Sequence, residues 1–256
     1  MKINDYVVRI SHNKDIIFKI KEFKNNKVIL NGVYTRLIAD AAINDLELVS
    51  EEILARTDNQ EYNYYESMIS TIKKESKEIN GKVLHLDSDI DYLKKCLKFY
   101  QDNNIYAYGV CLNEENMSQN IIELINQINP EVVVITGHDS YNKKGLNDLN
   151  NYSHTLDYIK AVKLVRQKFS LDDIFIYAGA CGSNFEALIA SGANMASSIT
   201  RDNIDAYDPA IIAYIASTTR ITNLISLDKF KKISKSDNKV IGGIDSYGKM
   251  RMINNY

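Results

Sequence analysis

The sequence predicts an α/β protein in which a parallel sheet, with helices on both faces, follows a small β-barrel. From residue 82 onward, apolar runs of strand length alternate with amphipathic helical segments, a rhythm typical of parallel sheets that are covered on both sides. Before residue 50, short runs alternate apolar and polar positions and are separated by Asn, Asp, Lys and Gly. That alternation indicates half-buried strands joined by turns.

These patterns divide the chain into three regions. Residues 1–50 are expected to form the barrel, of the SH3-like kind, from the strands YVVRIS, DIIFKIKEF, KVILNG, YTRLIA and LELV. Residues 51–80 change to a Glu- and Lys-rich composition with weak helical spacing, which predicts a polar, partly helical linker. Residues 81–256 hold the predicted α/β domain.

The α/β region has a regular order of elements. Its expected strands are residues 82–87, 105–110, 131–137, 174–179 and 193–199, and its expected helices are residues 88–102, 115–128, 156–168 and a segment that starts near Gly182. Right-handed crossovers place the C-terminal ends of parallel strands at one edge of a sheet. Ligands and catalytic groups of open α/β sheets gather beyond that edge, so the residues after each strand are the first candidates for function.

Composition excludes several classes of protein. Lys and Arg total 31 against 33 for Asp and Glu, and the chain has no basic stripe interleaved with aromatic residues, so a nucleic-acid partner is not expected. No run approaches the roughly 20 apolar residues of a membrane span, and the opening MKINDYVVRI does not resemble a signal peptide. We therefore expect a cytoplasmic protein.

Two of the strand ends carry residues that could act together in catalysis. Gly137-His138-Asp139-Ser140 follows VVVIT, and Gly179-Ala180-Cys181-Gly182-Ser183 follows IFIYA. A thiol becomes a competent nucleophile when an imidazole or a helix N-terminus stabilises its thiolate, and Cys181 is placed to have both. Cys181 is thus the predicted nucleophile and His138 the predicted base, with Gly137, Asp139 and Gly182 in the loops that would bind the oxyanion.

The other cysteines have less support. Cys111 follows the strand YAYGV and is the rival nucleophile, whereas Cys96 lies on the apolar face of its helix and is expected in the core. The three cysteines form no C-x-x-C spacing, which argues against a disulfide framework and against a thiolate zinc site.

The remaining histidines have structural interpretations. His12 lies in a predicted turn, His85 lies inside the strand VLHLD, and His154 precedes a helix as a capping-region residue. No histidine follows position 181. That order excludes the glutamine amidotransferases, which resemble G-A-C-G-S at the nucleophile turn but place their His after the Cys.

At these residues the chain resembles the caspase-like cysteine peptidases, in which one strand ends in the catalytic His and a later one in Ala-Cys. It is similar, more closely, to the YabG family of sporulation-specific peptidases. The segments that carry this resemblance are VVRISHNKDIIFKI, YTRLIADAAINDLELV, KVLHLDSDIDYLKKCLKFY, VVVITGHDSYNKK and AGACGSNFEALIASGANMASSITRDNIDAYDP.

The resemblance implies a peptidase of spore formation that processes spore coat or germination-related precursors, cuts after Arg and uses no metal or organic cofactor. It also implies a dyad of Cys181 and His138, and places the enzyme in the sporulating cell, in association with the forming coat. One departure concerns the oxyanion hole: caspase-like enzymes have Gly directly after the catalytic His, whereas Asp139 stands there in this chain.

A pocket for Arg needs a carboxylate that can take the guanidinium in a bidentate contact. The candidates are Asp202, Asp205 and Asp208, in the run RDNIDAYDP, and each of them could equally be a helix cap or a turn residue. Ser197 and Ser198, at the end of the preceding strand, could line the same pocket or merely pack.

A second group of carboxylates admits other interpretations. Asp87, Asp89 and Asp91 are spaced as a calcium loop begins, but Tyr92 stands where such a loop needs Gly, so we favour a helix start, where Asp meets the helix dipole. The same residues with Asp139 could instead describe a receiver-like regulatory module on a flavodoxin-like sheet. Such modules need a Lys at a late strand end, and ITRDNIDAYDP has none.

Overall fold

The computed structural model describes residues 1–24, 26–70, 78–236 and 240–253. The chain forms two compact units, Met1–Lys73 and Lys74–Tyr256, and each unit is described by itself. No helix of the described residues has both the length and the apolar character that crossing a membrane requires.

The first unit contains a five-stranded antiparallel sheet in the order β4-β3-β2-β1-β5. The strands are β1 (Tyr6–Arg9), β2 (Ile17–Lys24), β3 (Lys27–Gly32), β4 (Ile38–Ala41) and β5 (Leu46–Leu48), with 3-10 turns η1 (Ile10–His12) and η2 (Ile43–Asp45). Alternate residues build its core, as a half-buried strand requires: Val7, Phe18, Ile20, Val28, Leu30 and Leu46. Within the described part of this unit no ladder joins β4 to β5, so an SH3-like barrel remains a prediction.

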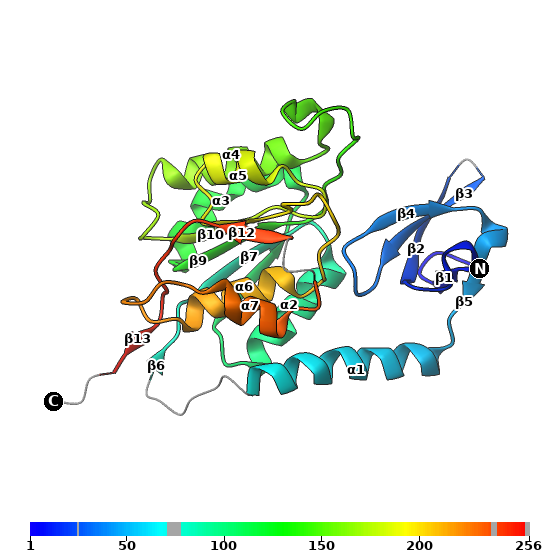
Figure 1. Ribbon diagram of the computed structural model, residues 1–256, viewed down its shortest axis with the longest axis horizontal. Coiled ribbons are helices and arrows are strands. Elements are labelled where there is room, and N and C mark those ends of the chain that lie inside the picture. The colour runs from blue at the N-terminus through cyan, green and yellow to red at the C-terminus, as the bar shows by residue number, and fades with distance from the viewer. Residues whose placement is uncertain (25, 71–77, 237–239, 254–256) are drawn as a thin grey trace. The chain divides into compact units, whose positions relative to one another are not determined.

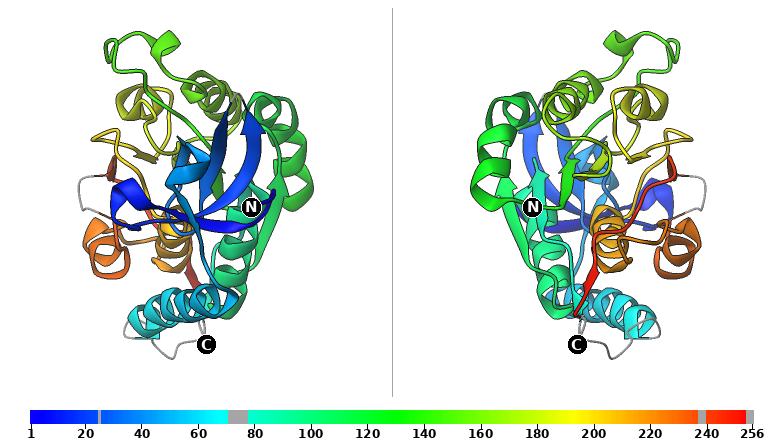
Figure 2. Two further views of the ribbon diagram at one scale, coloured as in Figure 1. Left: turned by 90° about the vertical axis from the view of Figure 1, so that its right-hand side faces the viewer. Right: turned by 90° about the vertical axis from the view of Figure 1, so that its left-hand side faces the viewer.

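The segment after the sheet is a long helix. Helix α1 spans Glu51–Ser70 and is drawn as one unbroken helix in Figures 1 and 2. The hydroxyl of Ser50 accepts a hydrogen bond of 3.3 Å from the amide of Ile53 at its start. Its buried residues, Tyr65 and Ile69, lie four positions apart and therefore on one face. Residues 71–77 of the expected linker lie outside the described residues.

The second unit contains a six-stranded mixed sheet in the order β12-β11-β10-β9-β7-β8. Its strands are β7 (Val83–Asp87), β8 (Ala107–Cys111), β9 (Val132–Thr136), β10 (Phe175–Ala178), β11 (Met195–Ser197) and β12 (Ile241–Gly243). The first five run parallel, as predicted, but β12 pairs antiparallel with β11. The expectation of a wholly parallel sheet is therefore wrong at this edge. A separate two-stranded ladder joins β6 (Glu78–Ile79) to β13 (Arg251–Met252).

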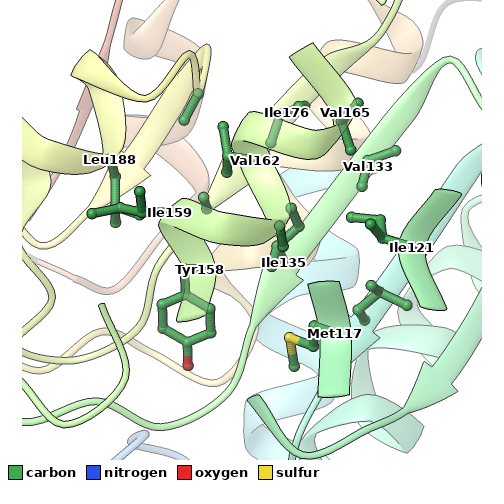
Figure 3. Packing of buried hydrophobic residues seen from close by; sticks show 14 of the residues in the cluster. Met117, Ile121, Val133, Ile135, Tyr158, Ile159, Val162, Val165, Ile176 and Leu188 are labelled. Carbon is green, nitrogen blue, oxygen red and sulfur yellow. The ribbon is translucent and has the colours of Figure 1, made fainter. Parts of the chain in front are cut away.

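Helices cover both faces of this sheet. They are α2 (Ile90–Asp102), α3 (Glu114–Ile128), α4 (Thr155–Arg166), α5 (Phe185–Ala190), α6 (Asp208–Thr218) and α7 (Leu227–Ile233), with a 3-10 turn η3 (Leu149–Asn151). Figure 1 shows α3, α4 and α5 on one side and α2, α6 and α7 on the other. The side of α3, α4 and α5 holds a cluster of buried hydrophobic residues, which Figure 3 shows in part. Its labelled members are Met117, Ile121, Val133, Ile135, Tyr158, Ile159, Val162, Val165, Ile176 and Leu188.

Candidate active site

His138 and Cys181 follow two neighbouring strands. Strand β9 ends directly before Gly137, and β10 ends directly before Gly179. The two strands are paired in register, and the amide of Gly179 donates a hydrogen bond of 3.0 Å to the carbonyl of Ile135. Because the strands are parallel neighbours, both candidate residues leave the sheet at the same edge.

The turns that follow these strands contact each other directly. The hydroxyl of Ser183, two residues after Cys181, donates a hydrogen bond of 2.8 Å to Oδ2 of Asp139. Gly182 has a left-handed backbone with φ of 73°, and a Cβ there would lie 3.4 Å from Cα of Ser140. The turn that carries Cys181 thus packs against the turn that carries His138, and a residue without a side chain suits this contact.

Cys181 is buried. Its exposed fraction is 8%. The amide of Ile204 donates to its sulfur over 3.4 Å, and a donor in this position stabilises the thiolate form relative to the thiol. The turn itself is held by the amide of Ala180, which donates to Oγ of Ser183 over 3.0 Å.

Three elements fix the position of His138. Its amide donates to Oε1 of Glu114 at the start of α3 over 2.8 Å, and its carbonyl accepts a hydrogen bond of 2.8 Å from the hydroxyl of Tyr158 in α4. Its Nε2 lies 3.3 Å from Oδ2 of Asp89, before α2. A Cβ at Gly137 would lie 2.3 Å from Oγ of Ser88 and 2.7 Å from Oε1 of Glu114, so these side chains would have to shift. Backbone and ring are therefore both anchored.

The carboxylate of Asp139 is hydrogen-bonded within the protein. Its carboxylate accepts hydrogen bonds from the hydroxyls of Thr155 and Ser183 and from the amides of Ser140 and His154. Burial raises the pKa of Asp139, and the hydrogen bonds oppose that effect in part. The side chain joins the two turns and α4. Any part that this residue has in oxyanion binding would come from its backbone amide.

Of the two predicted pocket serines, Ser197 contacts the turn that carries Cys181. Ser197 and Ser198 are fully buried at the end of β11. The hydroxyl of Ser197 donates to the carbonyl of Ala180 over 3.3 Å, and that of Ser198 donates to the carbonyl of Asp202 over 2.9 Å. The loop at residues 199–207, which holds Asp202, also supplies the amide of Ile204 to the sulfur of Cys181.

The three candidate carboxylates differ in their surroundings. Asp202 is exposed, Asp205 is half-buried and Asp208 is fully buried. Oxygen atoms of Asp208 accept hydrogen bonds of 2.5 Å each from the hydroxyls of Ser234 and Ser236, and one of 3.0 Å from the amide of Asp205. Asp208 therefore serves to join α6 to the segment after α7. Asp202 and Asp205 are the more accessible acids of this loop.

A family model described as YabG peptidase U57 matches residues 2–254. The chain belongs to this family. It is 36% identical over 280 residues to the sporulation-specific protease YabG of Bacillus subtilis (strain 168), and the alignment covers 98% of this chain and 97% of that protein. No solved structure matches the chain. The predicted resemblance to YabG peptidases is confirmed, and membership of a peptidase family favours a protease over the receiver-like module.

Among the cysteines of this YabG-family chain, Cys111 has surroundings that disfavour a nucleophile. It ends β8 and is exposed, and its sulfur donates weakly to the carbonyl of Ser88 over 3.7 Å. Burial of the thiol raises the pKa of Cys111, and the negative charges of Asp87, Asp89 and Glu114 raise it further. The thiolate is therefore scarce at neutral pH. Cys96 is fully buried, as expected of a core residue.

The rings of the other three histidines have polar neighbours of their own. His85 is fully buried, and its Nδ1 lies 2.9 Å from the hydroxyl of Tyr100. His154 directly precedes α4, with its Nδ1 3.3 Å from Asp157. His12 is exposed in the first unit, and its Nδ1 lies 2.8 Å from the hydroxyl of Ser11. In the described part of the chain, no group of His, Cys, Asp and Glu side chains could hold a metal ion.

Sequence analysis missed two carboxylates that contact His138. The sequence predicts a helix start at Asp89, and the structure confirms it. Oδ1 of Asp89 accepts hydrogen bonds from the amides of Asp91 and Tyr92. The same side chain also faces the imidazole. Nothing in the sequence around Glu114 indicates a contact with His138, because an acid in the first turn of a helix is common. In the structure, Glu114 accepts the hydrogen bond from the amide of His138. The strand end after β7 was the available signal for Asp89, because β7 lies beside β9 in the sheet.

Proposed function

We propose that this member of the YabG family is a cysteine endopeptidase in which Cys181 is the nucleophile and His138 the acid and base. The observation that supports the pair is the hydrogen bond between Ser183 and Asp139, which holds their two turns together at one edge of the sheet. The amide of Ile204 at the sulfur supports the assignment of the nucleophile, since it favours a thiolate.

The proposed reaction is acyl transfer in two steps. His138 takes the thiol proton, and the thiolate attacks the scissile carbonyl to form a tetrahedral oxyanion. When the intermediate collapses, the carbon–nitrogen bond breaks, and the imidazolium gives its proton to the leaving amine. Water then attacks the acyl-enzyme with His138 as base, and the thiol of Cys181 is regenerated.

Two backbone amides are suited to bind the oxyanion. Within the described residues, the amides of Asp139 and Gly182 donate no hydrogen bond, and they flank the candidate base and nucleophile. The amide of His138 itself is occupied by Glu114. Preorganised amides of this kind contribute about a hundred- to a thousandfold to the rate of acyl transfer.

We propose that the substrates are protein precursors of the spore coat or of germination, cut after Arg in the cytoplasm of the sporulating cell at the forming coat. The loop at residues 199–207 supports an Arg pocket, because it contacts the sulfur through Ile204 and carries Asp202 and Asp205. Ser197 and Ser198 would line the pocket with small side chains. The sheet of the first unit would hold the peptidase to its protein partners.

Peptide hydrolysis by single variants tests the dyad. Cys181→Ala and His138→Ala should each reduce cleavage of an Arg-containing peptide library to background while the circular dichroism spectrum is unchanged. Cys111→Ala is the matched control and should keep full activity. Cleavage by the Cys181 variant at the wild-type rate would refute the nucleophile assignment.

The pocket is tested separately with two peptides that differ in having Arg or Gln before the scissile bond. Asp202→Asn and Asp205→Asn, alone and together, should lower kcat/KM for the Arg peptide by about a hundredfold, because a charge-assisted bidentate contact is lost. The Gln peptide should be cut equally by all variants. An unchanged preference for Arg in the double variant would exclude both carboxylates.

A further inference from the structure

A third strand end lies next to His138, on the side away from Cys181. The sheet order places β9 between β10 and β7. Residues that follow these three strands are Cys181 after β10, His138 after β9 and Asp89 after β7. His138 therefore follows the strand that lies between the strands preceding Cys181 and Asp89.

The carboxylate of Asp89 contacts the imidazole in a largely buried environment. Oδ2 of Asp89 lies 3.3 Å from Nε2 of His138, and the exposed fractions of the two side chains are 10% and 16%. The ring of Tyr92, which is fully buried, has its centroid 5.9 Å from that of His138. An interaction between a carboxylate and an imidazolium is stronger in such surroundings than in water.

Helix α2 holds this carboxylate in place. Oδ1 of Asp89 accepts hydrogen bonds of 2.8 Å from the amide of Asp91 and 3.2 Å from the amide of Tyr92. Its own amide donates to Oδ1 of Asp87 over 3.0 Å. One oxygen thus caps the helix while the other faces His138, so the helix start helps to fix the orientation of the carboxylate.

We propose that Asp89 is the positioning residue for the catalytic base, which deepens the proposed function and rests on it. The carboxylate accepts the Nε2–H of His138, which leaves the lone pair on Nδ1 to take the proton of Cys181. Once that proton has moved, the ring is a cation, and the anion beside it stabilises the charge. The bond also keeps the ring from rotating between steps.

Two substitutions separate this role from helix capping. Asn caps helices as well as Asp does, whereas Ala does not. Asp89→Asn should keep the Tm of the wild type but lower kcat by about a hundredfold with KM nearly unchanged, because its amide group would donate to Nε2 and impose the opposite tautomer. Asp89→Ala should lower both Tm and kcat.

If Asp89 served only to cap the helix, Asp89→Asn would keep its activity and only Asp89→Ala would be impaired. A wild-type kcat in Asp89→Asn would therefore overturn the proposal. Asp102→Asn, at the other end of α2, is the control for removal of one negative charge. Asp102 pairs with Lys98 over 2.8 Å, and its replacement should leave kcat unchanged.

NMR spectroscopy tests whether Asp89 sets the tautomer of His138, and it does so in a protein without catalytic activity. In the Cys181→Ala protein, ¹⁵N NMR of the His138 ring should show the proton on Nε2, and the additional Asp89→Asn change should move it to Nδ1. A proton on Nδ1 with Asp89 intact would overturn the positioning role. Full activity of Cys181→Ala would instead refute the proposed nucleophile, so the two failures are distinguishable.

Discussion

Replacing Ser183 by Ala removes the hydrogen bond that links the turn carrying Cys181 to the turn carrying His138. Ser183 is fully buried; its hydroxyl donates to Asp139 over 2.8 Å and accepts from the amide of Ala180 over 3.0 Å. A hydrogen bond to a charged group contributes about 1.5–3 kcal/mol, and a buried amide left without an acceptor costs about 1–3 kcal/mol. Because such terms are not additive, we expect the free energy of unfolding to fall by about 2–4 kcal/mol.

Urea unfolding and peptide hydrolysis, measured on the same preparations, check this prediction. The matched control is Ser191→Ala: Ser191 is also buried, but its hydroxyl makes one neutral hydrogen bond of 2.7 Å, to the carbonyl of Leu188. This variant should lose about 1 kcal/mol and keep its activity. If Ser183→Ala costs no more than the control and retains wild-type kcat, the turns do not depend on this bond.

Three further outcomes are expected. Burial raises the pKa of Asp139 above its usual value of 3.8. The stability that the neutral carboxyl provides is therefore present below pH 3.8 and is lost as pH rises through the folded-state pKa. Over this pH range, the Tm of the wild type should fall relative to that of Asp139→Asn. Iodoacetamide followed by mass spectrometry should modify Cys181 before Cys111, since the pKa of Cys111 is raised; the opposite order would argue for the rival. Gly182→Ala, at φ of 73°, should lose at least about 1 kcal/mol in thermal melting and most activity; a wild-type Tm would contradict the strain argument.

The parts of the fold that could be predicted are those where burial alone determines the pattern. All five residues of β9 and all four of β10 are buried, so each strand is a mostly apolar run with a recognisable end. His138 and Cys181 could be chosen as candidates because they come directly after these ends. The helix starts near Gly182 and after Asp89 carry ordinary capping signals.

Other parts left no such signal. Strand β12 has three residues, of which two are Gly, and Gly weakens a strand pattern; its antiparallel pairing depends on the partner β11. Helix α1 buries Tyr65 and Ile69 but few other side chains, so its apolar spacing is weak. Asp208 resembles any acid before a helix in the sequence. Its full engagement by Ser234 and Ser236 depends on residues more than twenty positions away.

The amide of Ile204 has a consequence for chemical probes of this protein. The hydrogen bond that this amide donates to the sulfur of Cys181 affects how readily the sulfur reacts with an electrophile. The labelling rate of Cys181 consequently reports the conformation of the segment around Ile204, and a bound peptide that shifts this segment would change the rate before any bond is cut. The rate at which an electrophile labels Cys181, measured with and without a non-cleavable peptide, would show whether the peptide shifts this segment.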